Sequence, residues 1–180
     1  AAQQIALGDS RFALAGGAES MSRGAYLLPP QARSGLRMGH AGVTDLTLGI
    51  LSDPFGSGHM GVTAENIAQR CGLTREAMDQ FAMESHHKAA HAIAEGRFAG
   101  QIVPVRVREG RKEWQFEQDE HVREGVTLDD LARLKPAFAK EGVVTAGNAS
   151  GINDGAASLV LASADVGSEL PTDTAVWLRR

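Results

Sequence analysis

The pattern of apolar and polar positions is most regular in the middle of the chain. Apolar and small residues recur three or four positions apart over residues 78–93, which is typical of one buried face of a helix. We predict that this helix begins after Thr74, whose hydroxyl can cap the first turn, and that it ends at Gly96. Phe81 is predicted to lie on the inward face.

Two shorter helices are predicted on either side of it. The first has Thr63 as its N-cap, turns Ile67 and Ala68 inward and stops at Gly72. The second covers residues 127–134, where a capping threonine precedes two acidic residues that favour the positive end of a helix.

Four strands are predicted from shorter apolar runs. Residues 101–108 and 113–117 alternate between apolar and polar and are joined by a short turn, which is the pattern of a β-hairpin. Residues 11–15, which end in a turn at Gly16–Gly17, and residues 156–162 have the length of single buried strands. Because two strands do not make a stable sheet alone, we expect this chain to be a piece of a larger protein.

The remaining segments are less regular. Residues 1–7 are typical of the back half of a helix, with Gly8 as a left-handed C-cap. Residues 31–59 are rich in Gly, Ser, Asp and Pro and are predicted to form a loop.

Composition excludes several classes of function. The 180 residues carry a net charge of −4, which argues against a surface for nucleic acid or for an anionic membrane. No apolar run reaches the roughly 18 residues that a membrane span needs, and the N-terminus lacks a signal-peptide pattern, so we expect a cytoplasmic protein. Cys71 is the single cysteine, so no internal disulfide can form.

Most candidate sites have a better structural interpretation. His87 and His91 stand four apart on the predicted helix, but without a third ligand a solvated polar face is favoured over a metal site. Cys71 sits at the negative end of a helix, where a thiolate is disfavoured, and is interpreted as a half-buried structural cysteine. Gly16–Gly17 lacks the third glycine of a dinucleotide loop.

The small residues of GNASG, residues 147–151, give the strongest local signal. They would let backbone N–H and C=O groups meet an extended ligand that carries amides, and Ser150 could add one hydroxyl. A tight turn explains the same composition equally well, so the two interpretations stay open on composition alone.

Six stretches occur in the order and spacing of one known family: AGGAESMS, HMGVTAENIA, LTREAMDQFAMESH, GRFAGQIVPV, LKPAF and VTAGNASGINDGAA. From Ala1 to about Val166 the chain resembles thiolases, and most of all bacterial acetyl-CoA acetyltransferases and related 3-ketothiolases. The resemblance implies an α/β fold, with part of a thiolase-like α/β/α/β/α core and an inserted α+β loop domain. The implied division is residues 1–22 as core, 23–145 as the loop domain that binds coenzyme A (CoA), 146–166 as the return to the core and 167–180 as an unassigned tail.

The resemblance also implies which side chains contact a CoA thioester. His59 and Met60 would line the pantetheine end near the thioester, and Leu51 would be a further contact. Arg123 would lie near the nucleotide, and Phe138 would pack on the CoA molecule.

Two further contacts are expected on the pantetheine arm. Ala146 and Ser150 would lie along it, with the Ser150 hydroxyl bonded to an amide. The nucleophilic cysteine of the family would lie upstream of Ala1, and its histidine and second cysteine downstream of Arg180. We therefore expect no catalytic residue in this chain, and neither a metal nor a permanently bound cofactor.

The implied reaction is the Claisen condensation of two acetyl-CoA to acetoacetyl-CoA, or cleavage of a 3-ketoacyl-CoA by free CoA. The whole protein would be a homodimer or homotetramer that binds neither nucleic acid nor a membrane. The alternative is a non-catalytic module, derived from a thiolase, for CoA binding or oligomerisation.

Overall fold

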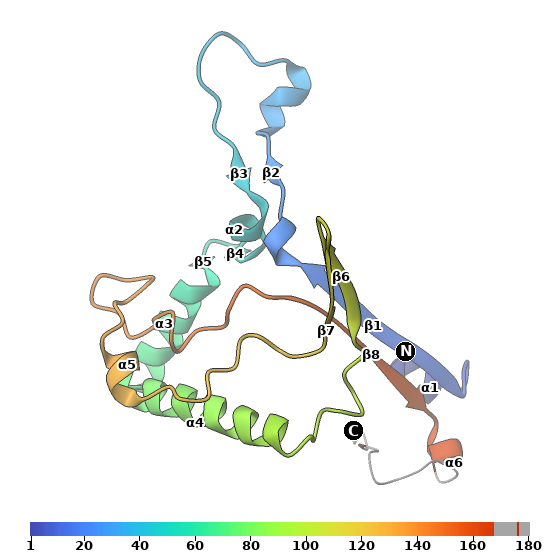
Figure 1. Cartoon of the computed structure of the whole chain (residues 1–180). Coiled ribbons are helices and arrows are strands. Elements are labelled where there is room, and N and C mark those ends of the chain that lie inside the picture. Colours follow the sequence, from blue (N-terminus) through green and yellow to red (C-terminus); the bar gives the residue numbers. More distant parts are fainter. Residues whose placement is uncertain (168–175, 177–180) are drawn as a thin grey trace. The chain divides into compact units, whose positions relative to one another are not determined.

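The computed structural model describes residues 1–167 and 176, and the chain divides into two compact units. The first consists of residues 1–23 together with the chain from 153 onward, and the second of residues 24–152. Helices and strands of both units are labelled in Figure 1.

The first unit is a long antiparallel pair of strands. β1 (Phe12–Ser20) pairs with β8 (Asp154–Ala162) over their whole lengths, and the two ribbons run side by side in Figure 1. The helices α1 (Ala2–Ala6) and α6 (Ala164–Gly167) and the 3-10 turn η1 (Met21–Arg23) adjoin the strands in sequence.

The prediction that the first strand stops at a Gly16–Gly17 turn is wrong, because β1 continues through both glycines. A Cβ atom at Gly16 would lie 2.8 Å from the carbonyl oxygen of Ala157 on β8. The glycine therefore permits a close approach between two paired strands, where the sequence suggested a reversal of the chain.

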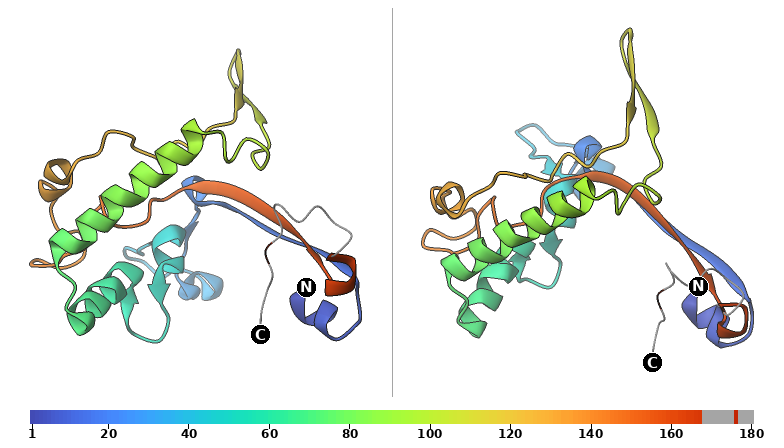
Figure 2. Two further views of the ribbon diagram at one scale, coloured as in Figure 1. Left: turned by 90° about the horizontal axis from the view of Figure 1, so that it is seen from below. Right: turned by 60° about the horizontal axis from the view of Figure 1, so that its bottom comes forward.

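The second unit contains the three predicted helices and three small hairpins, seen from two further directions in Figure 2. The hairpins pair β2 with β3, β4 with β5, and β6 with β7, each antiparallel. The elements in chain order are β2 (Tyr26–Leu27), η2 (Pro30–Ser34), β3 (Thr44–Asp45), α2 (Leu46–Ile50), β4 (Ser52–Asp53), β5 (Gly58–His59), α3 (Met60–Cys71), α4 (Arg75–Ala94), β6 (Val105–Glu109), β7 (Lys112–Phe116) and α5 (Leu128–Ala132).

Residues 31–59, predicted to be a loop, contain the short helix α2 and the strands β3, β4 and β5. Two aspartates organise them. The Asp45 carboxylate accepts a hydrogen bond from the backbone N–H of Thr47 at 2.8 Å and so caps α2. The Asp53 carboxylate accepts from the backbone N–H groups of Phe55 and Ser57 across the β4–β5 turn, and these bonds lower its pKa.

The ends of the long helix lie where the sequence predicted them. The Thr74 hydroxyl accepts a hydrogen bond from the backbone N–H of Ala77 at 3.2 Å, and Gly96 follows the helix with a φ of +69°. α3 begins earlier than predicted, because His59 and not Thr63 is its N-cap. The imidazole Nδ1 of His59 accepts from the N–H of Gly61 at 3.0 Å, as an Asn or Asp side chain would.

The predicted inward faces are correct only in part. Ala68 is buried as predicted, but 52% of Ile67 and 75% of Phe81 are exposed. The fully inward position on α4 belongs to Asp79, of which 3% is exposed. A carboxylate occupies this position because it is hydrogen-bonded on both oxygens, as described below. None of the helices in the described part of the chain is long and apolar enough to cross a membrane.

The start of α5 gives a test of stability against pH. Thr127 and Asp130 form a capping box, and hydrogen bonds from the Thr127 side chain and then its backbone lower the pKa of Asp130. A carboxyl group with a depressed folded-state pKa contributes stability above its unfolded pKa of about 3.9, and that contribution disappears as pH falls through the folded value. We expect Asp130→Asn to unfold at lower urea concentration than wild type at pH 7, with a smaller difference at pH 3.

The urea midpoints of both proteins at the two pH values check this prediction. Asp119→Asn, which removes an exposed carboxylate from the loop after β7, controls for the loss of one charge. A wild-type advantage over Asp130→Asn that is equal at both pH values would contradict it.

Candidate functional site

Four of the predicted contact residues meet at the start of α3. The Met60 backbone N–H donates to the carbonyl oxygen of Leu51 at 2.8 Å. The imidazole ring of His59 stacks on the phenyl ring of Phe138, with centroids 4.9 Å apart and planes 19° apart. Residues from two distant stretches of the sequence therefore share one surface.

Gly61 makes this stacking possible. It is buried directly after the N-cap, and a Cβ atom there would lie 2.4 Å from ring atoms of Phe138. Since His59 Nδ1 accepts the Gly61 N–H, the neutral imidazole carries its proton on Nε2. The site thus presents a fixed ring with one N–H donor, beside the Met60 side chain, of which 60% is exposed.

The Phe138 segment continues into the GNASG stretch through backbone pairing. The Ala137 N–H donates to the carbonyl oxygen of Val144 at 2.9 Å, and Pro136 and Thr145 form an antiparallel bridge. This pairing places the residues just before Phe138 next to Val144 and Thr145, and Thr145 is followed by Ala146, which is exposed. Ser150, also exposed, follows four residues later.

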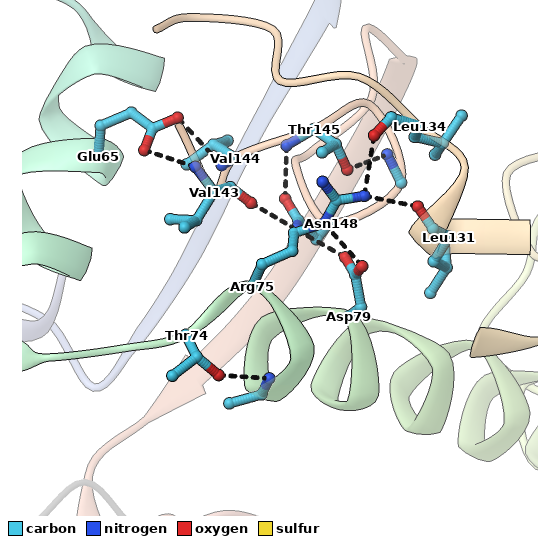
Figure 3. A network of polar contacts seen from close by, with 12 residues as sticks. Glu65, Thr74, Arg75, Asp79, Leu131, Leu134, Val143, Val144, Thr145 and Asn148 are labelled. Atoms are coloured by element: carbon cyan, nitrogen blue, oxygen red, sulfur yellow. Dashed lines mark hydrogen bonds and ion pairs between the residues drawn. The ribbon is translucent and has the colours of Figure 1, made fainter. Parts of the chain in front are cut away.

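The buried side of the segment is held by two carboxylates (Figure 3). The first belongs to Glu65 of α3, which accepts from the backbone N–H groups of Val143 at 2.9 Å and Val144 at 3.0 Å. Because both carboxylate oxygens take part, the segment is fixed in position and orientation against α3.

The second carboxylate is that of Asp79 on α4. One of its oxygens accepts from Asn148 Nδ2 at 2.8 Å and the other from Arg75 Nε at 2.7 Å. Asn148 Nδ2 also donates to the carbonyl oxygen of Val143, and Asn148 Oδ1 accepts from the N–H of Thr145 at 2.8 Å. The buried charge is therefore paired and fully hydrogen-bonded.

Arg75 extends the network to α5. Its guanidinium donates to the carbonyl oxygens of Leu131 at 2.6 Å and Leu134 at 3.0 Å, which lie at the helix end (Figure 3). α4, α5 and the GNASG segment are thus tied together by one arginine and one aspartate.

Sequence reasoning missed the residues of this network: Glu65, Arg75, Asp79, Thr145 and Asn148. The i,i+4 spacing of Arg75 and Asp79 predicts an ion pair, but not its burial, because such pairs usually lie on the exposed surface of a helix. Glu65 carries no comparable signal, since its partner Val143 is 78 positions away in the sequence.

The tight-turn interpretation of GNASG has direct structural support. The Asn148 N–H donates to the carbonyl oxygen of Thr145, and the Gly147 N–H to the Thr145 hydroxyl. A Cβ atom at Gly147 would lie 2.5 Å from Cδ2 of Leu131 and 2.6 Å from Cδ1 of Leu134. Gly147 is therefore required for packing, whatever its use toward a ligand.

Arg123 lies apart from the other predicted contacts. Its backbone N–H donates to Nδ1 of His86 on α4 at 3.3 Å, and the His86 and His121 rings are 5.8 Å apart. Burial, followed by repulsion from His121, Arg123 and His87, lowers the pKa of His86. Among the described residues, no hydrogen bond or ring contact joins Arg123 to the other six predicted positions.

The remaining candidates gain no ligand-binding geometry. His91 pairs with Glu95 at 3.0 Å, and the described residues contain no group of three or more His, Cys, Asp or Glu side chains that could hold a metal ion. Cys71 is exposed, not half-buried as predicted, because it lies in the last, solvent-facing turn of α3. Two surface hollows, lined by residues from 29 to 41 and from 115 to 122, contain none of the seven predicted contacts.

Known proteins resemble this chain over most of its length. It is 56% identical over 163 residues to beta-ketothiolase BktB of Cupriavidus necator, and 51% identical over 165 residues to an acetyl-CoA acetyltransferase of Pseudomonas aeruginosa. These matches cover 89% and 91% of this chain, and the chain spans 41% and 42% of the two relatives.

Solved structures agree in fold. The acetyl-CoA acetyltransferase of Bacillus anthracis superposes with a TM-score of 0.85 at 47% identity, over 93% of this chain and 42% of that one. Human mitochondrial 3-ketoacyl-CoA thiolase, solved in complex with CoA, superposes with a TM-score of 0.81 at 34% identity, over 93% of this chain and 41% of that one. The predicted fold class, part of a thiolase-like α/β fold, is confirmed.

The family model described as the N-terminal domain of thiolase matches residues 1–165. Together with the identities above, this match shows that the chain belongs to the thiolase family, with residues 1–165 belonging to its N-terminal domain.

Proposed function

We propose that this chain is the CoA-binding part of a thiolase-type acyltransferase, and that its CoA site is the surface at the start of α3. The observation that carries the proposal is the His59–Phe138 stack, because backbone pairing of residues 136–137 joins the Phe138 segment to the turn that exposes Ala146 and Ser150. Its support is the chemistry of these groups: apolar and aromatic side chains suit the pantetheine arm, and a hydroxyl and backbone amides suit its amide bonds.

Each contact has a separate role in this proposal. His59 Nε2–H and the Met60 side chain face the thioester end, with Leu51 behind them. Phe138 packs on the ligand, and Ser150 bonds an amide of the pantetheine. Arg123 meets the nucleotide end from the loop before α5. These roles follow the domain assignment of residues 23–145 to a loop domain and 146–166 to the returning core.

In the whole protein, the reaction would be condensation of two acetyl-CoA to acetoacetyl-CoA, or thiolysis of a 3-ketoacyl-CoA. The nucleophilic cysteine, the histidine and the second cysteine would be supplied by segments outside residues 1–180. A cytoplasmic homodimer or homotetramer without a metal or a permanently bound cofactor belongs to the same proposal.

The aromatic stack is the first part to test. Phe138→Ala removes the surface that packs on the ligand and the ring that orients His59, so we expect Kd for CoA to rise about tenfold, equivalent to about 1–2 kcal/mol. Isothermal titration of the 180-residue chain with CoA gives this value. Phe81→Ala is the matched control, because Phe81 is an exposed phenylalanine on α4.

Binding that is equally strong in wild type, Phe138→Ala and Phe81→Ala would contradict the proposed site. Circular dichroism spectra and melting curves of all three proteins establish that the measured affinities belong to folded chains.

Turnover distinguishes the enzyme from a non-catalytic module. We expect the 180-residue chain to cleave no acetoacetyl-CoA in the presence of CoA, and the intact product purified from its source cell to do so. The intact mass of that product is measured in the same preparation. Turnover by the 180-residue chain that disappears when one of its own residues is replaced would refute this division of labour. An intact product of 19.0 kDa without turnover would favour the module.

A further inference from the structure

We propose that Asn148 is a positioning residue, which acts through Asp79 to hold the turn at residues 145–148 in the orientation that binds CoA. The inference rests on the proposed function, because it concerns how that site is shaped. Neither side chain is placed against the ligand: Asp79 is buried, and the polar atoms of Asn148 are engaged within the protein.

The amide of Asn148 is fixed by three hydrogen bonds. Its Oδ1 accepts from the Thr145 N–H at 2.8 Å, and its Nδ2 donates to Asp79 at 2.8 Å and to the Val143 carbonyl at 3.0 Å. Two of these bonds close the turn on itself, and the third ties it to α4. Rotation of the turn as a unit would break the bond to Asp79, and opening of the turn would break the other two.

Asp79 cannot release Asn148 without leaving a buried oxygen unpaired. Its other oxygen is held by Arg75 at 2.7 Å, and Arg75 is held in turn by two carbonyl groups at the end of α5. The position of the turn therefore depends on its links to α4 and α5, and not only on hydrogen bonds within its own backbone.

The exposed side of the turn depends on this anchor. Ala146 lies between Thr145, which is fully buried, and Gly147, which packs against two leucine side chains. Ser150 follows Asn148 by two residues, and within the described residues its hydroxyl makes one hydrogen bond, a long one of 3.4 Å to the neighbouring Gly151 carbonyl. The backbone that carries Ser150 therefore leaves a turn whose position is held by Asn148.

The test variant replaces the side-chain amide of Asn148, which donates hydrogen bonds, by a carboxylate of similar size. Asn148→Asp can still accept from Thr145, but it loses both donated bonds and faces the Asp79 carboxylate. We expect Kd for CoA, measured by titration of folded 180-residue chain, to rise about tenfold or more. Adding Asp79→Asn restores an amide–carboxylate pair in the reverse direction, and we expect it to recover most of the affinity. Asn148→Ser, which is too short to reach Asp79, is the second variant if Asn148→Asp does not fold.

Thr74→Ala separates positioning from general stability. It removes the N-cap of α4, which bonds Ala77 and not the turn, so it lowers the melting temperature without altering the turn. We expect its Kd for CoA to equal that of wild type.

The possible failures are distinguishable. Wild-type affinity in Asn148→Asp or Asn148→Ser, or an equal loss in Thr74→Ala, would overturn the positioning role alone. A lack of rescue by Asp79→Asn would overturn the part assigned to Asp79. Failure of the wild-type chain to bind CoA would overturn the proposed function, and this inference with it.

Discussion

The second unit depends on a charge that is buried in a helix. Asp79 lies on the inward face of α4, where an unpaired carboxylate would be strongly destabilising. Its two oxygens can be satisfied only if Arg75 comes from one side and Asn148 from the other. The requirement to pair one buried charge therefore fixes the relative positions of α4, the end of α5 and the GNASG turn.

A second carboxylate, on α3, holds the same segment by hydrogen bonds. Glu65 accepts two backbone N–H groups of the segment that leads into the turn, just as Asp79 accepts the side chain that closes it. The segment is thus held on its buried side by hydrogen bonds to ionised groups, which are stronger than those between neutral groups. Its exposed side is left with small residues and accessible backbone, and these are the properties that an extended amide-bearing ligand requires.

The aromatic stack connects this turn with the start of α3. Phe138 precedes the turn and is joined to it by backbone pairing, while His59 caps α3 and carries its ring onto Phe138. Gly61 is needed between them because any side chain would collide with the phenyl ring. The proposed CoA surface is therefore formed by segments that are distant in sequence and meet through a few specific contacts.

The sequence by itself determined those features that depend on neighbouring residues. Thr74 and Thr127 cap their helices, and Gly72 and Gly96 end theirs, because each cap involves atoms within one turn of the chain. The first hairpin strand, predicted over residues 101–108, is wrong at its start: β6 begins directly after Pro104, since proline has no N–H to donate to a ladder. Family motifs identified the fold, and they pointed to His59 and Phe138, which do stack.

Only the tertiary structure decided which residues form the buried hydrogen-bond network around Asp79. Asp79 displaces Phe81 from the inward face of α4, and its partner Asn148 lies 69 positions away in the sequence. Helical periodicity cannot predict this, because it scores a carboxylate as polar and exposed unless its distant partners are known. Local sequence thus determined the main helices and those ends that a cap within one turn defines, while long-range pairing of buried charges determined how the second unit presents its turn.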